Sequence, residues 1–119
     1  MLDIEESDLE IMKKAAKEND YLGMNYYQSR FIQAYDGEND TDWDWLIHPE
    51  SMFDMLVRIK QQYPQYKAIY ITENGMGYKD DFEDGIIDDT PRIDYVRRHL
   101  YYLLKAIEAG VNVKGYFIW

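Results

Sequence analysis

Hydrophobic residues recur along this chain in two alternating patterns, one with helical spacing and one of short continuous runs. Helical spacing occurs in three segments, over residues 7–19, 49–63 and 90–109. A short apolar or aromatic run follows each of them, at residues 21–27, 68–72 and 113–119. The order helix, strand, helix, strand, helix, strand predicts a parallel sheet with right-handed crossover connections.

Each predicted helix begins at a recognisable signal. Ser7 and Glu10 have the spacing of a capping box for the first helix. Pro49 suits the first position of the second helix. Asp89 or Thr90 is the predicted N-cap of the third. The polar stretch from residue 79 to residue 89 is predicted to be a solvated acidic loop.

Apolar positions on one side of each helix predict the face that packs on the sheet. On the first helix these positions are Leu9, Met12, Ala15 and Ala16. On the second they are Met52, Leu56, Ile59 and Tyr63. On the third they are Ile93, Val96, Leu100, Leu103, Leu104 and Ile107.

One strand end carries a candidate catalytic group. The buried run from Ala68 to Thr72 leads directly to Glu73, on a loop that contains Gly75. In barrels and open α/β sheets the chemistry gathers where strands end, so Glu73 is a candidate by position and by type, against the alternative of a solvated loop carboxylate. Tyr27 and Trp119 each lie 46 residues from Glu73, at the ends of the other two predicted strands.

The composition indicates which binding partners are unfavourable and which cellular compartment is expected. The 119 residues make one domain's worth of sequence, with 13 basic and 23 acidic residues and a net charge of −10. This charge argues against nucleic acid and against anionic membrane surfaces as partners. The chain has no cysteine and no apolar run long enough to span a membrane. With an acidic N-terminal sequence that lacks the pattern of a secretory signal, these features predict a cytoplasmic protein.

Three motifs in the correct order resemble the family 1 glycoside hydrolases. They are the sixth-strand motif at residues 21–27, the nucleophile motif at 71–75 and the eighth-strand motif at 115–119. Four segments are most similar to the 6-phospho-β-galactosidase branch of that family, namely 41–45, 75–80, 92–96 and 116–119. The resemblance covers nearly the whole chain. It implies an α/β fold, a partial (β/α)₈ TIM barrel, in which residues 1–119 form a single segment with strands six to eight and the intervening helices.

The resemblance also implies a function for the complete barrel. That function is a retaining β-glycosidase of lactose catabolism, which hydrolyses 6-phospho-β-galactosides such as lactose 6-phosphate without a metal or an organic cofactor. A β-glucosidase or 6-phospho-β-glucosidase fragment is the neighbouring alternative. A non-catalytic interaction module that self-associates through the unpaired barrel edges is the alternative from another class.

The same resemblance places other parts of the machinery outside this chain. The acid/base glutamate follows the fourth strand in the family, and the phosphate-binding side chains lie beyond Trp119. The fragment alone is therefore expected to be inactive. The connection near residues 37–41 is shorter than in the family, which predicts a deleted or omitted loop.

Four side chains receive roles from the resemblance. Glu73 is the nucleophile, and Tyr27 donates its phenol to Glu73 and orients it. Asn25 binds sugar hydroxyls, and Trp119 lies beneath the sugar ring. The structural alternatives are a core tyrosine, a turn-forming asparagine and a core tryptophan. Four other ring side chains are predicted to be structural: Trp43, Trp45, His48 and His99.

Overall fold

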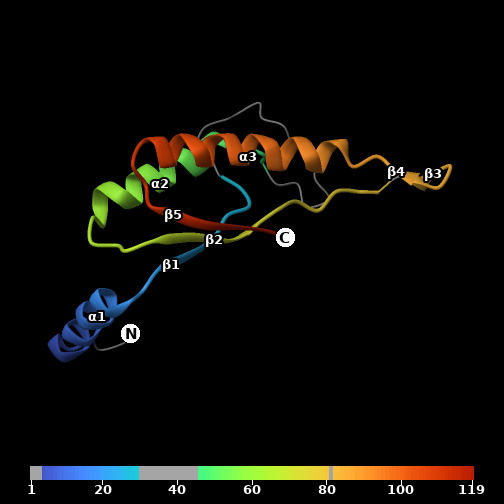
Figure 1. Ribbon diagram of the computed structural model, residues 1–119. Helices are drawn as coiled ribbons and strands as arrows, with labels where there is room; N and C mark the ends of the chain where they lie inside the picture. Colours follow the sequence, from blue (N-terminus) through green and yellow to red (C-terminus); the bar gives the residue numbers. More distant parts are fainter. Residues whose placement is uncertain (1–3, 30–45, 81) are drawn as a thin grey trace.

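The computed structural model describes residues 4–29, 46–80 and 82–119. Its main body is a parallel sheet with two helices packed on one face (Figure 1). The helices are α1 (Glu6–Glu18), α2 (Glu50–Gln62) and α3 (Thr90–Glu108). The strands are β1 (Leu22–Asn25), β2 (Ile69–Asn74), β3 (Phe82–Glu83), β4 (Ile86–Ile87) and β5 (Val113–Ile118). The predicted loop near residues 37–41 and the side chains of Trp43 and Trp45 lie outside the described residues.

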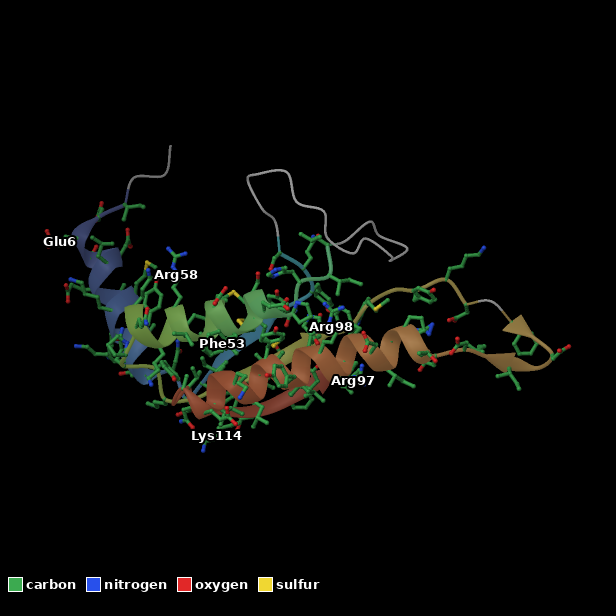
Figure 2. All side chains as sticks on the ribbon, turned by 90° about the horizontal axis from the view of Figure 1, so that it is seen from above. Glu6, Phe53, Arg58, Arg97, Arg98 and Lys114 are labelled. Atoms are coloured by element: carbon green, nitrogen blue, oxygen red, sulfur yellow. The ribbon has the colours of Figure 1, made fainter. Side chains whose placement is uncertain are left out.

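The main sheet has the strand order β1-β2-β5, and both pairs of neighbouring strands are parallel. The helices α2 and α3 form the two crossovers, lying side by side on the sheet while α1 stands at one end (Figure 2). This arrangement confirms the prediction of a partial α/β barrel segment. Tyr27, Glu73 and Trp119 accordingly lie at the carboxyl edge of adjacent strands, as the sequence predicted.

The hydrophobic core lies between the sheet and the two crossover helices. Met52 and Leu56 of α2 are fully buried and Ile59 packs partly buried against the core, which confirms three of the four positions predicted for this helix. Tyr63 is 57% exposed because α2 ends at Gln62 and the chain turns away. The other buried members of the core come from the sheet, from α3 and from the segments next to them: Tyr26, Ile69, Ile71, Leu103, Ala106 and Val111.

The face predicted for α3 was wrong in most positions. Of the six apolar residues only Leu103 is buried, whereas Ile93, Leu100, Leu104 and Ile107 are between 42% and 62% exposed. The face that meets α2 and the sheet instead carries four residues: Tyr95, His99, Leu103 and Ala106. Apolar spacing identified a real second stripe, but the packing of the sheet selected the stripe that contains a tyrosine and a histidine.

The first helix differs from its prediction in both its cap and its packing. None of the residues of α1 is buried, because no described element covers its apolar side. The capping box uses Glu5 and Asp8 in place of Ser7 and Glu10. A carboxylate at the N-cap accepts backbone N–H bonds as Ser does, so the capping motif lies two residues earlier than its expected Ser-x-x-Glu form.

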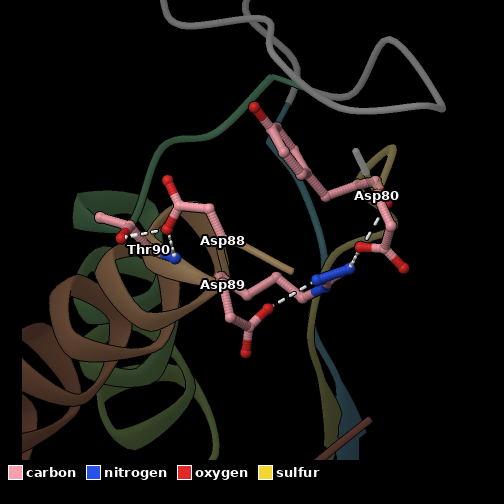
Figure 3. A network of polar contacts seen from close by, with 6 residues as sticks. Asp80, Asp88, Asp89 and Thr90 are labelled. Carbon is pink, nitrogen blue, oxygen red and sulfur yellow. Dashed lines mark hydrogen bonds and ion pairs between the residues drawn. The ribbon is translucent and has the colours of Figure 1, made fainter. Parts of the chain in front are cut away.

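The predicted acidic loop contains a two-stranded antiparallel hairpin formed by β3 and β4. Asp84 and Gly85, at the turn, both have positive φ, as a tight hairpin turn requires. This Asp-Gly pair is a hairpin signal in the sequence, although the acidic residues around it also fit a solvated loop. Arg92 ties the hairpin base to α3 through ion pairs with Asp80 and Asp89 (Figure 3).

Within the part of the chain that the structure describes, no helix is long and apolar enough to cross a membrane.

Candidate active site

A bulge in β2 decides which way Glu73 points. Pairing with β1 runs from Leu22↔Ile69 to Met24↔Ile71 and then shifts to Asn25↔Glu73, so Thr72 is an extra residue in β2. Pairing with β5 also shifts, between Ile71 and Asn74. Strand residues alternate between faces, so without this bulge Glu73 would share the buried side of Ile69 and Ile71. The bulge puts the side chain of Asn74 on the buried side and leaves Glu73 only partly buried.

The Tyr27 phenol donates a hydrogen bond to the Glu73 carboxylate. Backbone contacts support this pairing, since the Tyr26 N–H donates to the Glu73 carbonyl oxygen at 2.9 Å. The hydrogen bond to Glu73, followed by desolvation, raises the pKa of Tyr27 to about 12. The phenol therefore remains protonated and available as a donor at neutral pH. The predicted contact between Tyr27 and Glu73 is present.

Trp119 and Asn25 complete the edge on either side of this pair. The Tyr27 ring meets the Trp119 ring edge-on, with centroids 5.5 Å apart and planes at 79°. Trp119 is 61% exposed, so it does not fill the core, which was its structural alternative. Asn25 accepts a hydrogen bond of 2.6 Å from the Thr72 hydroxyl, and its amide NH₂ group makes no hydrogen bond within the described residues.

Gly75 allows the chain that follows Glu73 to pass the end of β5. A Cβ atom at position 75 would lie 1.9 Å from the Trp119 carbonyl oxygen, which no side chain tolerates. The Trp119 N–H donates to the Asn74 carbonyl oxygen at 2.9 Å, so the two backbones are hydrogen bonded at this point. The glycine of the nucleophile motif is thus required by close backbone approach.

Sequence reasoning gave no role to Asn74, which is fully buried beneath this edge. Its amide group donates to the Tyr26 carbonyl oxygen at 2.7 Å and to the Tyr95 hydroxyl at 3.1 Å. Its side-chain oxygen accepts a hydrogen bond from the Tyr116 hydroxyl. A polar residue next to a candidate nucleophile, at a position whose alternation is uncertain, was the only signal available in the sequence.

His99 lies behind this network in a fully buried position. Its ring packs 3.9 Å from the Tyr95 ring, and its Nδ1 lies 2.8 Å from the Tyr95 carbonyl oxygen. Its Nε2 finds no hydrogen-bond partner among the described residues. Burial is the main cause that lowers the pKa of His99 to about 4, with Arg98 acting in the same direction and Glu50 against it. A structural role agrees with the prediction for this histidine.

Acid is expected to destabilise the fold through His99. Between pH 6.5 and about 4 the unfolded chain binds a proton at His99 that the folded chain does not bind, so the stability present above pH 6.5 falls as the pH drops. The contribution is roughly 3 kcal/mol, at about 1.4 kcal/mol per unit of pKa. Urea unfolding of the wild type and of His99→Phe at pH 7 and pH 4 isolates it, because carboxylate titration cancels in the difference. Equal losses in both proteins would contradict the expectation.

These groups suit the attacking half of a displacement reaction, in which a carboxylate is the nucleophile. One carboxylate is oriented by a phenol, an aromatic face lies beside it, and an amide stands on the neighbouring strand. No group of three or more His, Asp or Glu side chains within the described residues is arranged to hold a metal ion.

A family profile described as Glycosyl hydrolase family 1 matches residues 34–119. The 6-phospho-beta-galactosidase of Clostridium acetobutylicum is 51% identical over 148 residues, covering 99% of this chain and 31% of that protein. The 6-phospho-beta-galactosidase of Leptotrichia buccalis is 44% identical and is covered to 32%. The chain therefore spans about a third of the length of these relatives.

Two solved structures superpose on nearly the whole of this chain. A family 1 b-glucosidase from Thermotoga maritima in complex with isofagomine lactam superposes with a TM-score of 0.82 and 32% identity, over 98% of this chain and 28% of that one. The AHE enzyme from Alicyclobacillus herbarius superposes with a TM-score of 0.85 and 30% identity, over 100% and 28% of the two chains.

Proposed function

This chain belongs to glycosyl hydrolase family 1, and on that premise we propose that it forms part of a retaining 6-phospho-β-galactosidase in which Glu73 is the nucleophile. The observation that carries the proposal is the hydrogen bond from Tyr27 to Glu73 at the carboxyl edge of the sheet, beside the exposed ring of Trp119. A buried phenol that serves only the core would not point at an exposed strand end.

The proposed reaction proceeds in two displacements. Glu73 attacks the anomeric carbon while the glycosidic C–O bond breaks, and the leaving oxygen takes a proton from a carboxylic acid that another part of the barrel supplies. A water molecule, deprotonated by that same group, then releases the sugar from Glu73. Tyr27 holds the carboxylate in the attacking orientation through its hydrogen bond. No step needs a metal or an organic cofactor.

The substrate-binding roles of Asn25 and Trp119 belong to the same proposal. An amide can pair with two neighbouring sugar hydroxyls, one as donor and one as acceptor. The exposed ring of Trp119 presents a flat apolar surface to the C–H face of a sugar. Both groups are on strands that flank Glu73, so a ring bound between them would present its anomeric carbon to the carboxylate.

A phosphorylated galactoside is the substrate class that the curated relatives favour, since both are named 6-phospho-beta-galactosidase at 44–51% identity. The b-glucosidase from Thermotoga maritima, at 32% identity, supports the alternative of an unphosphorylated glucoside. We place the activity in lactose catabolism in the cytoplasm, because the proposed substrate is a phosphorylated β-galactoside such as lactose 6-phosphate.

A shortened connection near residues 37–41 is a further part of the proposal. The alignment with the relative from Clostridium acetobutylicum extends over 148 positions, whereas this chain has 119 residues, so at least 29 aligned positions lack a counterpart here. Any test of activity therefore needs two versions of the protein, one with residues 37–41 as they stand and one with the longer connection of the relative.

Grafting this chain into two different barrels tests which kind of barrel it completes. Residues 1–119, in each of the two versions, replace the matching segment of the Clostridium acetobutylicum relative and, separately, that of the Thermotoga maritima b-glucosidase. We expect the first graft to hydrolyse a nitrophenyl 6-phospho-β-galactoside at a rate within about tenfold of that of its host. The second graft should lose on the order of 10²-fold or more of the activity that the b-glucosidase has on its own substrate, because misplaced groups at strand ends cost that much. The reverse ranking would favour the β-glucosidase alternative.

A further inference from the structure

The ends of the three strands are joined by side chains where the backbone ladder becomes irregular. β1 ends at Asn25, so the carbonyl groups of Tyr26 and Tyr27 lie beyond its regular pairing with β2. Both carbonyl oxygens nevertheless accept hydrogen bonds from buried side chains. Asn74 donates to that of Tyr26 at 2.7 Å, and the Tyr95 hydroxyl donates to that of Tyr27 at 3.1 Å.

Asn74 connects these two contacts to the third strand. The Tyr95 hydroxyl that donates to Tyr27 accepts a hydrogen bond from Asn74, which also accepts one from the Tyr116 hydroxyl of β5. Asn74 thus contacts the chain beyond β1, the strand β5 and the helix α3 from a single position in β2. We call Asn74, Tyr95 and Tyr116 the Asn74 network.

Both phenols of the Asn74 network are protonated, and therefore hydrogen-bond donors, at neutral pH. Tyr95 is 3% exposed, and burial raises its pKa far above the ordinary value. Burial also raises the pKa of Tyr116 to about 12. Both donor hydrogens of the Asn74 amide make hydrogen bonds. Because Asn74 is buried away from water, these hydrogen bonds are made only when the strands have the observed alignment.

We propose that the Asn74 network is a positioning device: it fixes the bulge in β2 and the chain after β1 so that the Tyr27 phenol meets the Glu73 carboxylate. A catalytic role for this network rests on the proposed function of Glu73, whereas its positioning of Tyr27 and Glu73 does not rest on that function. Because Asn74 directly follows Glu73 and opposes it across the strand, burying the amide forces the carboxylate to the other side.

The geometry explains why a polar residue occupies this core position. Apolar side chains of similar volume could fill the space, but they would leave the Tyr26 carbonyl oxygen and the Tyr116 hydroxyl without this partner. They would not distinguish the bulged register from the regular one. Three directed hydrogen bonds do, since they are satisfied only when the ends of β1, β2 and β5 are in the observed alignment.

The experiment uses the 119-residue chain with ¹³C-labelled tyrosine rings. The signal is the change in the Tyr27 Cζ chemical shift that Glu73→Gln produces, with Tyr27→Phe giving the assignment. In a Tyr95→Phe or Tyr116→Phe background we expect that response to fall to roughly half or less, because residues that share a network are coupled. The nuclear Overhauser effect between the Tyr27 and Trp119 rings should weaken in parallel.

Tyr102→Phe is the matched control, because it removes another tyrosine–carboxylate hydrogen bond, to Glu50 at 2.8 Å, outside the network. It should leave the Tyr27 response at its wild-type value. Asn74→Ala should abolish the response; if that variant does not fold, the two Tyr→Phe variants decide alone, since each removes one oxygen atom. Folded Tyr95→Phe and Tyr116→Phe proteins with a full Tyr27 response would overturn the proposal, even if their unfolding midpoints were lower.

This test is independent of catalysis. A Glu73 that proved not to be the nucleophile would leave the chemical-shift response unchanged, and the proposed function would fail while the positioning stood. Loss of the response in the variants together with an unimpaired Glu73→Gln enzyme would identify the network as structural positioning without a catalytic consequence.

Discussion

Glu73→Gln is expected to reduce turnover by a complete barrel that carries this chain by a factor on the order of 10⁴–10⁶, the size found when an enzyme loses its nucleophile. The amide keeps the shape of the side chain and can still accept the hydrogen bond from Tyr27. It is a poor nucleophile, so no covalent glycosyl intermediate forms. The measurement is kcat for a nitrophenyl 6-phospho-β-galactoside in the graft based on the Clostridium acetobutylicum relative.

Glu108→Gln provides the matched control, since Glu108 is an exposed carboxylate at the end of α3 that pairs with Lys105. This variant should retain the activity of the unaltered graft. A Glu73→Gly graft adds a second criterion, because azide can occupy the vacated space and attack the anomeric carbon directly, giving a glycosyl azide of inverted configuration. A fully active Glu73→Gln graft would refute the assignment of the nucleophile.

The 119-residue chain alone should show no appreciable hydrolysis of the same substrate. General acid assistance to the leaving group is worth about 10²–10⁴-fold, and the proposed function assigns that role to a group outside this chain. The binding surface that aligns the sugar with Glu73 is also incomplete, and loss of alignment removes several further orders of magnitude. The comparison is between the purified chain and the grafted barrel at equal molar concentration.

Molecular mass in solution is measured on the same sample. Within the described residues, β1 and β5 are edge strands and α3 has an exposed apolar stripe; both features favour association between copies, which is the basis of the interaction-module alternative. A chain that turns over substrate at a rate near that of the grafted barrel would contradict the requirement for a second carboxylate. A defined oligomer without activity would favour the interaction module.

Much of the architecture could be predicted from the sequence because it depends on local patterns. The periodicity of three apolar stripes and three short runs gave the order of elements, and parallel strands in that order bring Tyr27, Glu73 and Trp119 to one edge. The predicted contact between Tyr27 and Glu73 followed from the resemblance to a family, since spacing alone places the residues near each other without fixing which atoms meet.

Errors arose where one pattern allowed two outcomes. The third helix has two apolar stripes, and only contact with α2 and the sheet selected the one with Tyr95 and His99. The hairpin was missed because an Asp-Gly turn in an acidic stretch also fits a solvated loop. The first helix has an apolar face that nothing in the described structure covers, so burial could not follow from its sequence.

The sequence by itself determined that a carboxylate follows a buried strand, with a phenol and an indole at the ends of the strands on either side. Only the tertiary structure decided which way that carboxylate points. Strict alternation from Ile69 and Ile71 would bury Glu73 and expose Asn74, and the bulge at Thr72 reverses both. The Asn74 side chain that the bulge buries is hydrogen bonded to residues just beyond β1, on β5 and on α3, which are 21 to 48 residues away in the sequence. No local pattern records those partners, so the orientation of the candidate nucleophile is a property of the assembled sheet.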